Sequence, residues 1–255
     1  MPTISKTSAT LHASRQSYHH GDLRQTLIDA TELLLAERGP EGFSLREVAR
    51  RSGVSAAAPT HHFGGSEGLL AAVATMAFEA LLVEMEAGRE RGGSDPVARL
   101  REQGVGYVRF ALRYPGRFKL MFRSGLRPDV ALSQAAHSAY VALEDSVRAL
   151  LGKPEGAPLD PTERQAFWAI WSVVHGFAHL ALAGQFDARH GGYGATPVGA
   201  DQPDASLPWD QSMLVEVLPA MLEQQLAAWV QHGGSEPLTK TAPSGATTSA
   251  GERVG

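Results

Sequence analysis

The sequence predicts an all-α protein. No alternating apolar run is long enough to make a convincing strand, whereas apolar residues recur at helical spacing in many segments. The first of these segments, residues 22–38, ends at Gly39-Pro40, a pair that cannot continue a helix. Its apolar face consists of Leu23, Leu27, Ala30 and Leu34.

Length and composition narrow the class of protein. The 255 residues permit one large domain or a small domain joined to a medium one, and the net charge is -4. Cysteine is absent, which excludes disulfides and thiolate metal sites, and no secretory signal is recognisable, so a cytoplasmic protein is expected. Residues 1–17 and 233–255 are rich in small and polar residues and are expected to be mobile tails.

Two short helices are predicted after the first one. Ser44 followed three residues later by Glu47 is a capping box, so a helix opens at Ser44. Ser52-Gly53 ends it after about two turns, and Ser55 is a natural N-cap for the next helix. Two short helices joined by a glycine-containing turn form a helix-turn-helix, here at about residues 44–63.

The second helix of this motif carries little apolar bulk, which suits a helix that enters the major groove of DNA. Alanines permit close approach and can contact thymine methyl groups, while hydroxyls, imidazoles and an arginine can bind bases or phosphates. Arg50 and Arg51 either add to this basic surface or are simply solvated charges at a helix end. The candidate DNA-binding residues are Ser44, Arg46, Ser55, Ala56, Ala57, Thr60, His61, His62 and Ser66.

The rest of the chain predicts further helices. A fourth helix opens at Ser66, which can cap it. The segment at residues 165–184 has no formal charge and is long enough to span a membrane, but its histidines and the absence of flanking basic clusters favour a helix buried on nearly every side. No membrane contact is therefore expected. The predicted helices after the motif cover residues 66–91, 96–113, 114–122, 127–152, 162–187 and 209–232.

The segment "FSLREVARRSGVSAAAPTHHFGGSEGLLAAVATMAFEAL" resembles the DNA-binding domain of TetR-family transcriptional regulators, with the match extending over about residues 21–81. The resemblance implies a homodimer that binds a palindromic operator and usually represses transcription until a small molecule binds its C-terminal domain. Two positions depart from the family pattern, since Thr60 stands where many relatives have tyrosine and Ser66 where lysine is frequent. These departures point to weaker phosphate anchoring.

The C-terminal part resembles one subclass of the family. "WSVVHG" is similar to its Trp-x-x-x-His-Gly signature and "RYPGRFKLMF" to its second typical segment. In the family, the last two long helices pack with those of a second subunit, which implies a homodimer here. The expected organisation is an arm at residues 1–17, a DNA-binding domain at 18–81, a ligand-binding and dimerisation domain at 82–232 and a tail at 233–255.

Aromatic residues of the C-terminal part supply a candidate pocket for a small hydrophobic effector, although such residues are often plain core. The candidate ligand-binding residues are Phe110, Phe118, Phe122, Tyr140, Trp168, Trp171 and His175. His175 and His179 lie one turn apart, but no third ligand is evident, so no metal or cofactor is predicted. No nucleophile elbow or phosphate loop is present, which argues against an enzyme. The alternative function is a helical binding dimer that has lost operator recognition.

Overall fold

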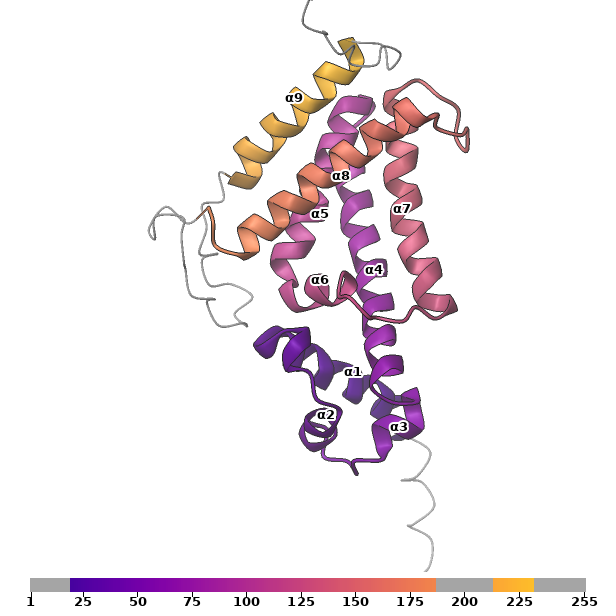
Figure 1. The fold of residues 1–255 in the computed structure, drawn as a ribbon, viewed down its shortest axis with the longest axis vertical. Coiled ribbons are helices and arrows are strands. Elements are labelled where there is room, and N and C mark those ends of the chain that lie inside the picture. The colour runs from indigo at the N-terminus through magenta and orange to yellow at the C-terminus, as the bar shows by residue number, and fades with distance from the viewer. Residues whose placement is uncertain (1–18, 187–212, 232–255) are drawn as a thin grey trace, which may run out of the picture.

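The computed structural model describes residues 19–186 and 213–231, and within these ranges the chain is helical and contains no strand (Figure 1). The predicted arm, tail and 188–208 connection, and the start expected for the last helix at residue 209, lie outside the described residues. The elements are α1 (His19–Arg38), η1 (Pro40–Gly42), α2 (Leu45–Arg51), α3 (Ala58–Phe63), α4 (Ser66–Arg91), α5 (Pro96–Arg113), α6 (Pro115–Met121), α7 (Val130–Leu150), α8 (Pro161–Leu182), η3 (Met213–Val217) and α9 (Leu218–Gln231). The all-α prediction is confirmed.

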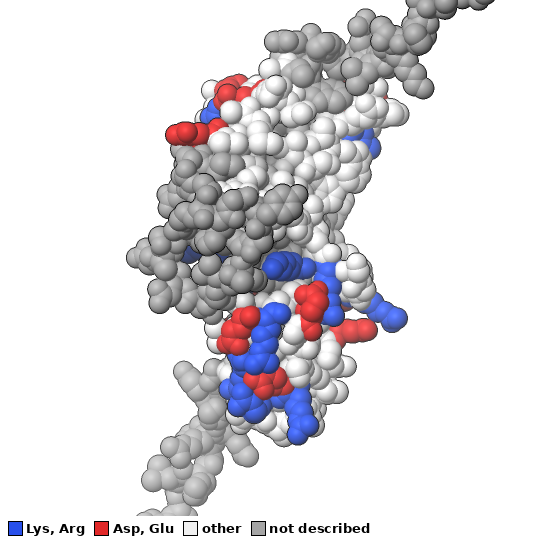
Figure 2. Space-filling view, turned by 60° about the vertical axis from the view of Figure 1, so that its left-hand side comes forward, with Lys and Arg blue, Asp and Glu red and all other residues white. Residues whose placement is uncertain are grey.

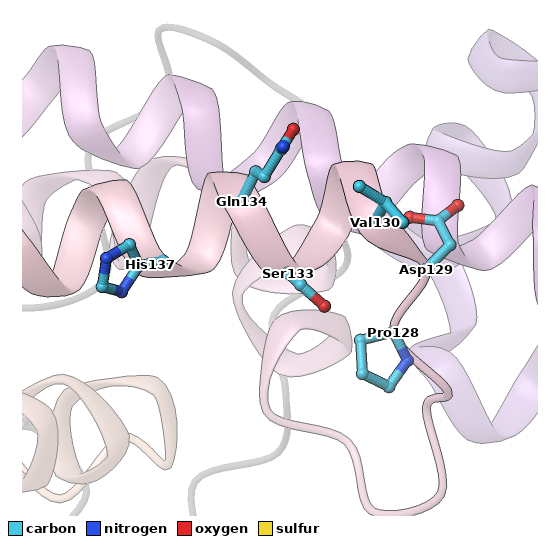
Figure 3. A pocket seen from close by; sticks show the side chains of 6 residues that line it. All are labelled: Pro128, Asp129, Val130, Ser133, Gln134 and His137. Atoms are coloured by element: carbon cyan, nitrogen blue, oxygen red, sulfur yellow. The ribbon is translucent and has the colours of Figure 1, made fainter.

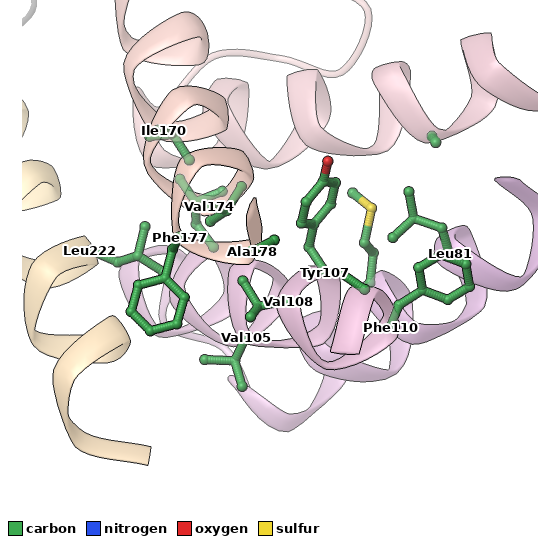
Figure 4. Close-up of a cluster of buried hydrophobic side chains, with 14 of the residues drawn as sticks. Leu81, Val105, Tyr107, Val108, Phe110, Ile170, Val174, Phe177, Ala178 and Leu222 are labelled. Atoms are coloured by element: carbon green, nitrogen blue, oxygen red, sulfur yellow. The ribbon is translucent and has the colours of Figure 1, made fainter. Parts of the chain in front are cut away.

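Two apolar cores lie one above the other in Figure 1. The lower core joins α1, α2 and the first half of α4, and the upper core joins the second half of α4 with α5 to α9. Figure 4 shows side chains from α4, α5, α8 and α9 meeting in the upper core. Because α4 is one continuous helix that contributes to both cores, it links the small N-terminal unit to the larger C-terminal one.

Among the described helices, α4 is long and apolar enough to satisfy the length and composition of a membrane span. Its apolar residues are accounted for by packing, since Leu69 and Val73 lie in the lower core and Leu81 and Met85 in the upper core. Burial of this kind is expected of the central helix of a helical protein, so its hydropathy needs no membrane.

One predicted helix start and one predicted cap differ from the structure. The helix expected to open after Ser55 begins at Ala58, because Pro59 has no N–H to bond the Ser55 carbonyl; the N–H of Ala58 bonds that carbonyl instead, at 3.0 Å. Ser66 does not cap α4 either. Gly65 occupies the N-cap position without a side-chain hydrogen bond, and Ser66 is the first helical residue.

The helix expected at residues 162–187 ends at Leu182, and it is not buried on every side. Ala166, Ile170 and Val174 face the core, whereas the side chains of Trp168 and Leu180 are both 48% exposed. Val217 of the neighbouring η3 and Met221 of α9 are also large apolar side chains that one chain leaves exposed. The sequence thus predicted more burial of α8 than one chain provides.

Candidate nucleic-acid interface and cavity

The turn between α2 and α3 packs against the lower core. Gly53 adopts a φ of +67°, a conformation that other residues rarely tolerate, and so it ends α2 sharply. Val54 and Phe63 pack against the lower core, and Pro59 is buried. The guanidinium of Arg24 on α1 lies 5.0 Å from the centre of the Phe63 ring. These contacts fix the orientation of α3 and leave its opposite face uncovered.

The structure places the predicted DNA-binding residues along α2, the turn, α3 and the start of α4. All of them are exposed except His62, which is half-buried with its ring 5.3 Å from that of His61. Ser44 accepts a hydrogen bond from the backbone N–H of Glu47 at 3.4 Å, so it caps α2 as predicted. The reciprocal half of the capping box is absent, because the Glu47 carboxylate binds arginines instead.

Two of the three arginines of the motif, Arg50 and Arg51, form ion pairs with glutamates. Arg50 donates to both oxygens of Glu47 at 2.8 Å, and Arg51 donates to Glu47 at 3.0 Å. Arg51 also forms a fork on Glu37 of α1, at 2.6 and 2.7 Å, which fastens α2 to α1. Hydrogen bonds from Arg50 and then Arg51 lower the pKa of Glu47 to about 2, so this acid stays ionised at neutral pH.

Arg46 is exposed and forms no ion pair with a described residue, which makes it the arginine of the motif that is free to bind a phosphate. Figure 2 shows that Lys and Arg gather around the lower part of the described chain on this face, interleaved with Asp and Glu. The positive charge of the candidate interface is therefore local and partly neutralised.

A cavity of about 440 Å³ lies in the upper core, within the size range of small-molecule sites. None of its lining residues is Lys, Arg, Asp or Glu. The lining comprises Phe78, Leu81 and Met85 of α4, Leu100, Gln103, Gly104 and Tyr107 of α5, Phe122, then Ala136, His137, Ala139, Tyr140 and Leu143 of α7, and Phe167, Ile170, Trp171 and Val174 of α8.

The buried Tyr107 of the cavity wall and the half-buried His175 behind it are uncharged at neutral pH. The hydroxyl of Tyr107 and Nδ1 of His175 are hydrogen-bonded at 2.8 Å, with the direction set by the imidazole tautomer. Burial raises the pKa of Tyr107, opposed in part by Trp171, while burial and then the neighbouring His179 lower the pKa of His175. An uncharged, apolar site suits an uncharged, apolar ligand.

A shallow groove of about 730 Å³ lies on the outside of α7 and the loop before it (Figure 3). His137 contributes to the lining of both this groove and the cavity. Pro128 and the exposed Val130 give the groove an apolar end, and Ser133 and Gln134 face solvent beside it.

The short helix α6 belongs to both cores. Its Phe118 is fully buried in the upper core, with its ring centre 5.6 Å from that of His175, while Leu120 is fully buried in the lower core. Gly116 lies directly on the backbone of α1 at Leu35. Arg117 donates to Glu32 of α1 at 2.6 Å. Movement of α6 must therefore disturb α1.

Comparisons with known proteins match both halves of the chain. Residues 27–73 match the family model "Bacterial regulatory proteins, tetR family", and residues 100–198 match "Tetracyclin repressor-like, C-terminal domain". The chain belongs to the TetR family. It is similar to the HTH-type transcriptional regulator BetI of Paraburkholderia xenovorans, 35% identical over 78 residues, which are 31% of this chain and 40% of BetI. The matched models are those of a family of transcriptional regulators rather than of enzymes, and the alignment spans less than half of the length of BetI.

Solved structures support the same fold. A protein of unknown function from Rhodococcus sp. RHA1 is 28% identical, with a TM-score of 0.59 over 84% of this chain and 98% of that one. The TetR family transcriptional regulator PfmR of Thermus thermophilus is 20% identical, with a TM-score of 0.52 over 79% of this chain and 94% of its own. The TetR fold therefore extends over most of the described residues.

The cavity includes only part of the predicted ligand-binding set. Phe122, Tyr140 and Trp171 line it, and His175 reaches it through Tyr107. The remaining three do not line it. Phe110 and Phe118 are fully buried in the core, and Trp168 stacks on the outer side of Trp171, with ring centres 5.4 Å apart.

Sequence reasoning missed most of the wall contributed by α4, α5 and α7, notably Met85, Gln103, Tyr107 and His137. Helical spacing shows which residues face inward, but a cavity depends on how five segments pack. One signal was available. Gln103 lies on the apolar face of a helix, and a buried amide in such a position requires partners.

Proposed function

We propose that this TetR-family member is a dimeric, ligand-responsive regulator that binds a palindromic operator and is released from it by a small hydrophobic molecule. The two functions belong to the two predicted domains: residues 18–81 bind DNA, and residues 82–232 bind the effector and the second subunit. The observation that carries the proposal is the position of α6, which packs on the cavity wall through Phe118 and on α1 through Gly116.

The mechanism is a change in the spacing of the two DNA-binding units. Filling the cavity displaces Phe122 or Tyr107, whose rings contact Phe118 at 5.2 and 5.7 Å between centres. The displacement reaches α1 through the Arg117–Glu32 ion pair. Because the recognition helices of a dimer must match half-sites about 34–36 Å apart or a multiple of that, a small rotation weakens both contacts at once.

DNA binding is proposed to use the exposed face of α3 and the first turn of α2. Ala56, Ala57 and Thr60 are small enough to let α3 enter the major groove, and His61 is exposed for a base or phosphate contact. Arg46 supplies a free positive charge beside them. The proposal extends to Ser44, Ser55, His62 and Ser66, which lie along the same surface.

The second subunit is proposed to cover the apolar face of α8 and α9. Trp168, Leu180, Val217 and Met221 are 37% to 48% exposed in one chain, and packing them against their symmetry mates would remove them from water. Leu180→Glu should convert a dimer into a monomer in sedimentation velocity, whereas Val83→Glu, a change at an exposed residue of α4, should not. A Leu180→Glu variant that stays dimeric would contradict this interface.

The test of the function is selection of bound sequences from a random duplex pool, followed by anisotropy with the selected duplex. We expect a palindrome that His61→Ala and Arg46→Ala both weaken. We also propose a cytoplasmic location, in keeping with a regulator of transcription, and membership of the Trp-x-x-x-His-Gly subclass through Trp171, His175 and Gly176.

A second candidate function is a helical binding dimer that no longer recognises an operator. It is favoured by the pairing of Arg50 and Arg51 with Glu47 and Glu37, which leaves little free positive charge near α3. Absence of any enriched sequence at low salt, from a protein that still dimerises, would favour this alternative.

A further inference from the structure

The accessible part of the cavity wall is mainly aromatic. Many lining side chains offer almost no surface to a molecule inside the cavity, since Leu81, Phe167 and Ile170 are only 1–2% exposed. Other lining residues are not fully buried, and most of these carry a ring. The lining residues that keep accessible surface are Ala136, Leu143 and five with a ring, Phe78, Phe122, His137, Tyr140 and Trp171. A ligand in the cavity is therefore expected to touch mainly rings.

These rings come from different helices and lie in two groups. On one side of the cavity, Phe78 of α4 and Phe122 at the C-cap of α6 have ring centres 6.1 Å apart. On the other side, the ring centre of Phe167 on α8 lies 4.5 Å from that of Tyr140 on α7 and 6.1 Å from that of Trp171. The aromatic surface is thus built by the packing of four helices and not by one helix alone.

The imidazole of His175 joins the two groups into a continuous series of ring contacts. Its centre lies 4.6 Å from that of Phe122 and 6.1 Å from that of Trp171. Neighbouring rings along the whole series are tilted by 48° to 73°. Rings inclined in this way cannot all turn their edges toward one point, so a ligand among them meets ring faces as well as edges. Edge-to-face and offset contacts are the arrangements that aromatic pairs prefer.

The charge of the wall restricts the ligand as well. The lining contains no Lys, Arg, Asp or Glu. Burial raises the pKa of Tyr107 and, together with His179, lowers the pKa of His175, so both side chains are neutral near pH 7. A carboxylate or an ammonium ion in the cavity would lose hydration without gaining a counter-charge, which is costly.

We propose that the effector contains an uncharged aromatic ring system, which binds among the rings of Phe78, Phe122, Tyr140 and Trp171. The inference rests on the proposed function in taking the cavity as the effector site. An aliphatic molecule of the same size would also bury apolar surface, but it would gain nothing from the quadrupoles of the surrounding rings. The four rings are then the residues that select the class of ligand.

The test measures the binding of small probes to the full chain by isothermal titration calorimetry at pH 7. The aromatic probe is 2-naphthol, and its counterpart is decahydro-2-naphthol, which has the same carbon skeleton and hydroxyl group but no aromatic ring. Wild-type protein should bind 2-naphthol about twofold to tenfold more tightly, the usual value of one aromatic pair beyond the burial of area. Two further probes, 1-octanol and the charged 2-naphthoate, should both bind more weakly than 2-naphthol.

Two variants assign the preference to the cavity wall. Phe78→Leu and Trp171→Leu each remove a ring from one side of the cavity and keep an apolar side chain, so each should reduce the ratio of the two affinities towards one. Phe177→Leu is the matched control, because this residue is a buried ring of α8 that does not line the cavity, and it should keep the wild-type ratio. Circular dichroism establishes that each variant is folded, and the wild-type comparison stands without them.

Several results would overturn the proposal: equal or tighter binding of decahydro-2-naphthol by the wild type, tighter binding of 2-naphthoate, or no binding of any probe. A preference that survives in both folded cavity variants, or that is also lost in Phe177→Leu, would overturn it too. The proposed function is judged separately, by anisotropy with the selected duplex. A protein that prefers the aromatic probe but does not release its duplex would contradict the proposed function and leave the ligand class standing.

Discussion

Gly116→Ala tests whether α6 is seated on α1. A Cβ at this position would lie 2.7 Å from both the carbonyl carbon and oxygen of Leu35 and 2.9 Å from the backbone nitrogen of Ala36. Restoring an ordinary separation of about 3.4 Å requires α6 to move by about 0.7 Å, and backbone atoms of α1 cannot rotate away as a side chain would.

The expected cost follows from overpacking, which is typically about 1–3 kcal/mol, offset by up to about 1 kcal/mol from replacing glycine by alanine in a helix. We therefore expect the free energy of unfolding to fall by about 1–2 kcal/mol, measured by urea denaturation followed by circular dichroism. Affinity for the selected duplex should also fall, because the shift imitates the movement that the effector is proposed to cause.

Lys119→Ala is the matched control, because this residue is exposed on the same helix and its removal should change stability by less than about 0.5 kcal/mol. If Gly116→Ala were as stable as the wild type and bound DNA equally well, α6 would not be packed against α1, and the proposed route between cavity and DNA would be refuted.

Three further predictions concern charge. Arg46→Ala should reduce the slope of log affinity against log salt by about 0.9, the value of one phosphate contact, and an unchanged slope would remove Arg46 from the interface. Glu47→Gln should increase the affinity for the duplex and steepen the salt slope, because it releases Arg50. The pKa of Glu47 is lowered to about 2 in the folded state, so the free energy of unfolding of the wild type should fall as the pH drops from about 4.5 towards 2. The part of this pH dependence that comes from Glu47 should be absent in the variant. Because folding lowers the pKa of His175, the unfolded state binds more protons than the folded state below about pH 6.5. Acidification in that range should therefore lower the free energy of unfolding of the wild type more than that of His175→Gln. Equal pH dependence of the two proteins would contradict a neutral imidazole at this position.

The N-terminal part was predictable because its signals are local. The capping serine at Ser44 and the turn glycine at Gly53 act through backbone geometry within a few residues, and both appear in the structure as expected. The start of α3 was missed by two residues, although the cause, the absent N–H of Pro59, is also local. The helix boundaries at residues 66–91 and 96–113 were predicted correctly for the same reason.

The site was less predictable because it depends on packing between distant segments. Phe118 carries the same aromatic signal as Phe122, yet one is fully buried core and the other lines the cavity. Pairing of Arg51 with Glu37, fourteen residues away, could not be read from the helix-turn-helix alone. The apolar face of α8 was interpreted as buried, and only the structure shows that one chain leaves Trp168 and Leu180 exposed.

The central claim is that occupation of the cavity weakens DNA binding. The most direct measurement is the Kd for the selected duplex, by fluorescence anisotropy at fixed salt, with and without saturating 1-octanol, in protein that calorimetry shows to bind the alcohol. The account predicts that the alcohol raises the Kd by at least about fivefold, the lower end of typical coupling between sites. A Kd that stays the same while the cavity is occupied would contradict it, because a ligand that does not distinguish the two states cannot shift their balance.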